Sequence, residues 1–335
     1  MSLNSIQSLL VLLLTIIIPP SSPSSPFPSA AELAEITETA RSSLTRVGSN
    51  YGGWMIWLKP LSAHSVIYSV GVGTDISFDL QLIRRVNVEV NAFDGTPISR
   101  EWFQKRIASG KFPPLLIKRF HLYPYLLGAE DGNLTLNRPR GHTISYSPDT
   151  LQPPDGFWEE AVTLPARRLR TLMAMLNHSV IDVLKVDIEG GEFGVFAQTV
   201  RDHRTLASSR SAHKARRPRG RIKRRDGRRG EQEQERGEEV GGEDEEGERA
   251  RSLPAVRYLP VCQLLVEFHP HLTGPEASHS ATAEALQNLA SLGFELLHYV
   301  HQADGARNAL LLNPRFCRST APDGDGDGAP DMLEK

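Results

Sequence analysis

Cysteine is scarce in this chain of 335 residues, which contains only Cys262 and Cys317. Two cysteines are too few for a disulfide-rich scaffold, and their spacing matches no metal-binding motif. They could form one bridge in an oxidising, lumenal compartment, or they could remain two partly buried thiols. The net charge is also small, at -2, which predicts no general affinity for nucleic acid or anionic lipid.

Positive charge is missing from the N-terminus, where an apolar run extends from Leu9 to Ile18 with only Thr15 interrupting it. About ten apolar residues are too few to span a bilayer comfortably, and they match the core of a signal peptide better. We therefore interpret residues 1–30 as a signal peptide or signal-anchor with a Ser/Pro-rich linker, which could act as a membrane tether. An organelle transit segment and an ordinary buried element are the alternatives.

A signal sequence would place the protein in the secretory pathway, either secreted or anchored in the ER or Golgi lumen. Two N-glycosylation sequons, at Asn133 and Asn177, would matter only in that case.

Apolar periodicity is absent from a charged stretch in the second half of the chain. Ten Lys or Arg stand against one acid between His213 and Arg229, and ten Asp or Glu against one Arg between Glu231 and Glu248. This composition predicts a disordered loop insertion at about 205–252. No aromatic residues interleave with the basic half, so we expect no specific nucleic-acid partner. The acidic, Gly-rich residues 320–335 are expected to form a disordered tail.

A glycine turn organises the rest of the chain. Residues 66–70 predict a strand that ends at Gly71-Val72-Gly73; a helical pattern follows, and then residues 88–93 predict a strand that ends on Asp94. This is half of a nucleotide-binding βαβ unit. Gly71 and Gly73 would let a ligand approach the backbone at a helix N-terminus. Asp94 is placed to accept hydrogen bonds from ribose hydroxyls.

The third glycine of the dinucleotide-binding fingerprint is missing, because Ile76 stands at its position. A nucleoside without pyrophosphate, such as S-adenosylmethionine, therefore fits the turn better than NAD does. The competing interpretation is an ordinary βα turn followed by a surface aspartate.

Acidic residues follow two later strands. Glu130 and Asp131 come after an expected third strand, at residues 121–127, where they could approach an adenine amino group or simply form a solvated turn. Asp187 and Glu189 follow an apolar fourth strand at residues 180–186. Close carboxylates of this kind are costly unless they bind a metal, a cation or a substrate hydroxyl, and Lys185 could be an internal partner.

A histidine completes this group of polar residues. The fifth expected strand finishes with an acid, Glu267, and with His269, near the place where the other strand-end loops converge.

Five short stretches together resemble the FkbM-like methyltransferases, especially the branch that contains the methyltransferase-like 24 proteins. These stretches are Tyr51–Trp54, Tyr68–Asp79, Ala92–Pro97, Leu184–Gly190 and Gln263–His269. The resemblance implies an α/β class I methyltransferase fold over residues 31–319: a Rossmann-like, seven-stranded, mostly parallel sheet with an antiparallel last strand. Two departures are Gly95, where the family usually has proline, and Asn308-Ala309, where an acid is expected.

The resemblance also implies that Gly71, Gly73 and Asp94 lie at S-adenosylmethionine, with Asp187 and Glu189 beside it. The expected activity is O-methylation of a small-molecule or glycan acceptor, with Asp187, Glu189 or His269 as the base that takes the hydroxyl proton. A metal-free mechanism is favoured over a Mg²⁺- or Mn²⁺-dependent one, because no complete ligand set is visible along the chain. A non-catalytic scaffold in the secretory pathway and a nicotinamide oxidoreductase are the alternatives.

Overall fold

A computed structural model of the chain describes residues 29–140, 146–148, 158–202, 259–273, 278–303 and 305–317. The expected signal segment (apart from its last two residues), the charged insertion and the acidic tail lie outside the described residues. Among the described helices, none is both long and apolar enough to cross a membrane.

The main sheet has seven strands and is the expected methyltransferase sheet. In spatial order its strands are β12 (Glu295–His301), β13 (Arg307–Leu312), β11 (Val261–Phe268), β10 (Ile181–Val186), β3 (Val66–Val70), β4 (Glu89–Phe93) and β5 (Phe120–Tyr123). Only β13 runs antiparallel to its neighbours in this sheet. The predicted α/β fold with an antiparallel last strand is therefore confirmed.

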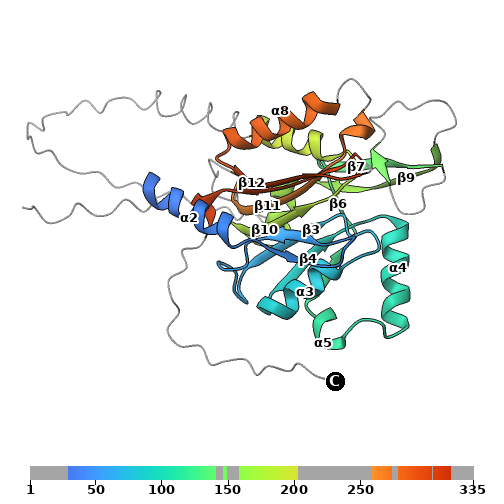
Figure 1. Cartoon of the computed structure of the whole chain (residues 1–335). Helices are drawn as coiled ribbons and strands as arrows, with labels where there is room; N and C mark the ends of the chain where they lie inside the picture. The colour runs from blue at the N-terminus through green and yellow to red at the C-terminus, as the bar shows by residue number, and fades with distance from the viewer. Residues whose placement is uncertain are drawn as a thin grey trace, which may run out of the picture.

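Helices cover both faces of this sheet, as Figure 1 shows with α8 above it and α3 below it. One face packs against α6 (Leu169–Met175), the helical residues 192–202 and α8 (Ser278–Ser291). The other face packs against α2 (Ala30–Ser42), α3 (Ser77–Val86), α4 (Pro97–Ala108) and α5 (Pro114–Ile117). Because side chains alternate along a strand, Ile67 enters the second core and Tyr68 the first. Burial on both faces explains why the central strands read as continuous apolar runs.

A second sheet of four strands was not predicted. Its order is β6 (Leu126–Leu127), β9 (Trp158–Arg167), β7 (Gly132–Pro139) and β8 (Ser147–Pro148). Pro124 within the expected third strand at residues 121–127 predicts an edge position or a bulge, and β5 is indeed an edge strand of the main sheet. The expected strand was wrong as one element, because Pro124 separates β5 from β6. Proline has no N–H to continue a ladder, so the chain leaves the main sheet there. Strand β7 pairs along its length with β9.

The N-terminal helix is shorter than the sequence suggested. Apolar residues at helical spacing from Leu33 to Leu44 predict one amphipathic helix from Ala31 to Val47, ended by Gly48. In the structure α2 ends at Ser42, and β1 (Thr45–Val47) pairs with β2 (Trp54–Ile56). Gly48 has a φ of +106°, and a Cβ there would lie 3.1 Å from the Cα of Phe78. Gly48 therefore belongs to the β1–β2 connection, where only glycine fits, and does not cap the helix.

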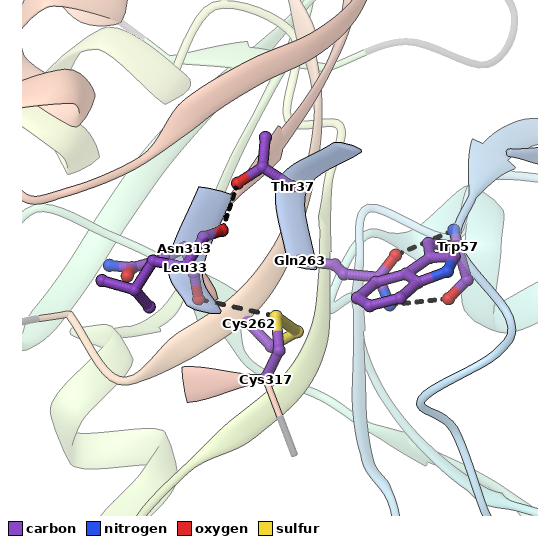
Figure 2. The surroundings of a disulfide bond; sticks show 7 residues. All are labelled: Leu33, Thr37, Trp57, Cys262, Gln263, Asn313 and Cys317. Atoms are coloured by element: carbon purple, nitrogen blue, oxygen red, sulfur yellow. Dashed lines mark hydrogen bonds between the residues drawn. A yellow bond between two sulfur atoms is a disulfide. The ribbon is translucent and has the colours of Figure 1, made fainter. Parts of the chain in front are cut away.

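A disulfide joins Cys262, in β11, to Cys317, which follows a short 3₁₀ helix at Pro314–Phe316. Figure 2 shows the bond beside Gln263, whose side-chain amide donates to the carbonyl of Trp57 and accepts from its N–H. The backbone N–H of Asn313 also donates to the carbonyl of Cys262. Together these contacts attach the start of β11 to Trp57, which follows β2, and to Asn313 and Cys317, which follow β13. The sequence left the pairing of the cysteines open, and the structure shows it.

Replacing both cysteines with serine is expected to destabilise the fold. The bond closes a loop of 55 residues, for which the chain-entropy relation gives about 4 kcal/mol of stabilisation. Urea unfolding of the oxidised wild type and of the double variant measures the difference, and the reduced wild type should behave like the variant. Equal midpoints for all three samples would show that the bond adds nothing to stability.

Candidate active site

A cavity of about 530 Å³ opens at the carboxyl ends of β3, β4, β10 and β11. This is where open α/β sheets bind their ligands, because β3 stands between strands that lead to opposite edges of the sheet. Six of the eight residues that the sequence singled out line it: Gly71, Gly73, Asp94, Asp187, Glu189 and His269. Glu267, Lys185 and Asn308 also line it and were not among those eight, although the sequence suggested Lys185 as an internal partner of the acids.

The two glycines of the turn serve different purposes. Gly71 has a φ of +76°, and a Cβ there would overlap the carbonyl oxygen of Asp187. Gly73 has a φ of +55°, and no atom lies within 4 Å of its Cβ position. Gly71 is thus required by the packing of the turn on the end of β10, whereas Gly73 leaves its backbone open towards the cavity.

Asp94 holds the glycine turn in place. Its Oδ2 accepts the N–H groups of Val72 and Gly73 at 3.0 and 3.1 Å. Its Oδ1 accepts the N–H and the hydroxyl of Thr96 at 2.9 and 2.7 Å. A carboxylate has about four acceptor positions, so these bonds occupy them all. The turn's N–H groups are therefore not free as the sequence suggested, and a ribose hydroxyl would have to share or replace one of these bonds.

Glu130 and Asp131 lie outside the residues that line the cavity. Glu130 forms an ion pair with Arg168. Asp131 accepts the N–H of Arg168 at 2.8 Å and the hydroxyl of Thr171 at 2.9 Å, which satisfies donors at the start of α6. The hypothesis that these acids approach an adenine amino group has no support in their positions. It failed because the sequence did not reveal the second sheet, into which the chain turns after β5.

The second sheet supplies an apolar wall instead. Leu127 of β6 and Leu134 and Leu136 of β7 line the cavity, and so does Ser147 of β8. Ser147 is 1% exposed, and its hydroxyl has no hydrogen-bond partner in the described part of the chain.

The carboxylates gather around His269, which is 4% exposed. Its Nδ1 lies 2.9 Å from Glu192, a fully buried acid whose carboxylate accepts the N–H groups of Ile188 and Gly190. Its Nε2 lies 3.5 Å from Glu267, 3.6 Å from Glu189 and 3.8 Å from Asp187.

A turn at the end of β10 makes this arrangement possible. We expected Asp187 and Glu189 on one side of a continuing strand, but β10 ends at Val186 and Glu189 has a φ of +53°. The two acids do meet near His269, by a different backbone path from the one expected.

Two pKa values in this group are displaced. Burial raises the pKa of Asp187 to about 7, with Lys185 opposing the shift and Glu267 adding to it. Burial lowers the pKa of His269, but the charge and hydrogen bond of Glu192 outweigh this effect and leave the pKa well above its usual value. The surroundings of His269 therefore favour a positive charge at this place.

Lys185 connects the acids to the turn. Its Nζ donates to the carbonyl of Gly71 at 2.7 Å and lies 3.7 Å from a carboxylate oxygen of Asp187. It also lies over the ring of Trp54 at 5.3 Å. The internal partner that the sequence suggested for the acids is therefore present, although one lysine faces several carboxylates.

Substitution of the two glycines by alanine should separate their roles. Gly71→Ala is expected to destabilise the fold by about 3 kcal/mol or more, because the backbone of β10 must move. Gly73→Ala should cost about 1–2 kcal/mol, the strain of a left-handed residue with a side chain. Urea unfolding of the two variants measures this, and equal losses would contradict the proposed packing of Gly71 on Asp187.

Two solved methyltransferase structures are similar to this chain at a low level. A human methyltransferase 10 domain containing protein is 9% identical, with 93% of this chain and 99% of that chain covered and a TM-score of 0.32. The N-terminal domain of human METTL16 in complex with SAH is 9% identical, with 90% and 78% covered and a TM-score of 0.34. Similarities this low carry no weight for function. No curated protein gives a significant match.

The family assignment comes from the sequence of the domain itself. The family model of the methyltransferase FkbM domain matches residues 41–214, which is just over half of the chain. The matched region contains the glycine turn, Asp94 and the end of β10, the elements that form one side of the cavity. This chain belongs to the FkbM methyltransferase family.

Proposed function

We propose that the protein is an S-adenosylmethionine-dependent methyltransferase that methylates a hydroxyl oxygen of a small-molecule or glycan acceptor. One observation carries the proposal: the glycine turn and Asp94 line the same cavity as the acids at the ends of β10 and β11. A cofactor at the turn and an acceptor at the acids would thus be neighbours.

The residues of the cavity suit this cofactor. Asp94 lines the cavity beside the glycine turn, where a ribose hydroxyl could share or replace one of the hydrogen bonds that its carboxylate accepts, and the backbone at Gly73 is open to an approaching ligand. Leu134 and Leu136 offer an apolar surface for a planar base, and the unpartnered hydroxyl of Ser147 offers it a hydrogen bond.

The acids supply the proton acceptor that O-methylation needs. When bound, the cofactor supplies an electrophilic methyl group: the carbon–sulfur bond breaks with its electron pair left on sulfur, and a carbon–oxygen bond forms. A carboxylate among Asp187, Glu189 and Glu267 would accept the proton that the hydroxyl loses. Lys185 and His269 bring positive charge to this wall of the cavity, and both charges oppose the burial that raises the pKa of Asp187.

Cofactor binding can be tested directly with S-adenosylhomocysteine, the product form, in isothermal titration calorimetry. The wild type is expected to bind it and to show no binding of NAD. Asp94→Ala should weaken binding roughly 10- to 150-fold, the scale of hydrogen bonds to a charged group. Asp131→Ala is the matched control, because Asp131 is an acid outside the cavity and should leave the affinity unchanged.

Two results would contradict the proposal. A folded wild type that binds NAD and not S-adenosylhomocysteine would indicate an oxidoreductase. A wild type that binds neither would indicate a protein that keeps the fold without the cofactor. Equal affinities in the Asp94 and Asp131 variants would remove Asp94 from the binding site.

We further propose that the protein matures in the secretory pathway. A disulfide between Cys262 and Cys317 supports this, since such bonds persist in oxidising compartments. Both sequon asparagines, Asn133 and Asn177, are exposed. Exposed acceptors are available to the glycosylation machinery of that pathway.

Glycosylation provides the test of this location. Protein isolated from the cells that produce it should lose apparent mass on digestion with an N-glycosidase, and the Asn133→Gln and Asn177→Gln variants should each lose part of that shift. Unshifted protein with two free thiols would place the chain outside the pathway.

A further inference from the structure

We propose that the ends of β10 and β11 bind one divalent cation, with Asp187, Glu267 and His269 as its protein ligands. The cation's role in methyl transfer rests on the proposed function, whereas its binding does not. The sequence favours a metal-free site, because Lys185 and His269 offer countercharge to the acids and no complete ligand set is visible along the chain. The fold brings together ligands that are 80 residues apart in sequence, Asp187 and Glu267.

The geometry of the three ligand atoms fits one ion. A carboxylate oxygen of Asp187, one of Glu267 and a ring nitrogen of His269 all lie within 4.8 Å of one another. The Nε2 of His269 lies 3.5 Å from Glu267 and 3.8 Å from Asp187. Two ligands that are each about 2.1 Å from one ion are about 3.0–4.2 Å apart for bond angles between 90° and 180°. These atoms therefore need little movement to share an ion.

His269 is held in the orientation that a metal ligand needs. Its Nδ1 is bonded to Glu192, which is itself fixed by the N–H groups of Ile188 and Gly190. A carboxylate on the second ring nitrogen is the usual support of metal-binding histidines, because it sets the ring orientation and raises the basicity of the first nitrogen. The Nε2 then points towards Asp187 and Glu267.

Asn308 provides an independent observation. It stands opposite Glu267 on the neighbouring strand β13 and lines the cavity. Its side-chain oxygen is buried, and no group in the described part of the chain donates to it. A buried amide oxygen without a donor is costly, and such oxygens are common ligands of Mg²⁺, Mn²⁺ and Ca²⁺. A cation, directly or through a bound water, would satisfy it.

The local charge also favours a cation. Four carboxylates, those of Asp187, Glu189, Glu192 and Glu267, surround His269. The Nζ of Lys185 lies 3.7 Å from a carboxylate oxygen of Asp187 and also donates to the carbonyl of Gly71. Two carboxylate ligands, one imidazole and an amide oxygen form a mainly hard donor set, which suits Mg²⁺ or Mn²⁺. In this position the ion would bind the hydroxyl oxygen of the acceptor and lower the pKa of that hydroxyl group.

Titration of Mn²⁺ into the full-length protein tests the site, with unbound Mn²⁺ followed by electron paramagnetic resonance. The wild type is expected to bind one Mn²⁺ per chain. Glu267→Gln and Asp187→Asn should each weaken binding at least about tenfold, since even supporting residues around a metal change its affinity by 10- to 100-fold. Glu130→Gln is the matched control, an acid outside the cavity that should bind as the wild type does.

Calorimetry with S-adenosylhomocysteine on the same samples separates this proposal from the proposed function. Mn²⁺ binding that Glu267→Gln weakens supports the cation site even if the nucleoside does not bind. The proposal is overturned if the wild type shows no stoichiometric binding of Mn²⁺. It is equally overturned if the Glu267 and Asp187 variants, folded by circular dichroism, bind Mn²⁺ as tightly as the wild type.

Discussion

The contact between the glycine turn and the end of β10 is the constraint on which the site depends. Gly71 lies so close to the backbone of Asp187 that any side chain would overlap it, and the N–H of Asp187 donates to the carbonyl of Val70. Lys185 adds a bond to the carbonyl of Gly71, and Asp94 holds the other side of the turn. The glycine-turn side and the acidic side of the cavity are therefore built on one junction, which fixes the distance between them.

Two cationic side chains offset part of the negative charge that is partly buried at that junction. The acids at the ends of β10 and β11 would repel one another in a partly buried cavity, and Lys185 and His269 offset this only in part. A site with an excess of carboxylate attracts positive charge, whether it comes from a proton, a metal ion or the sulfonium of a cofactor. The charge of Glu192 raises the pKa of His269, whereas burial is the main cause of the raised pKa of Asp187, to which the charge of Glu267 adds.

The disulfide, the hydrogen bonds at the start of β11 and the second sheet help to determine the shape of the cavity. The disulfide and the Gln263–Trp57 hydrogen bonds fix the start of β11, the strand that ends at Glu267 and His269. The second sheet adds Leu127, Leu134 and Leu136 to the lining of the cavity. The acids and these apolar side chains thus line one cavity, which suits a ligand with a polar reacting end and a flat apolar part.

The sequence determined those parts of the protein that depend on local patterns. Apolar runs specified β3, β10 and β11, because strands buried on both faces need such runs. A β-rich run specified β4, and residues next to strand ends pointed to Gly71, Asp94 and Asp187. Tertiary structure alone decided what depends on pairing between distant segments. It joined Cys262 to Cys317, added Glu267 and Asn308 to the site, and excluded Glu130 and Asp131 by routing the chain into a second sheet after Pro124. Side chains from strands far apart in sequence meet only once the order of those strands is fixed, and that order is set by packing of the whole sheet.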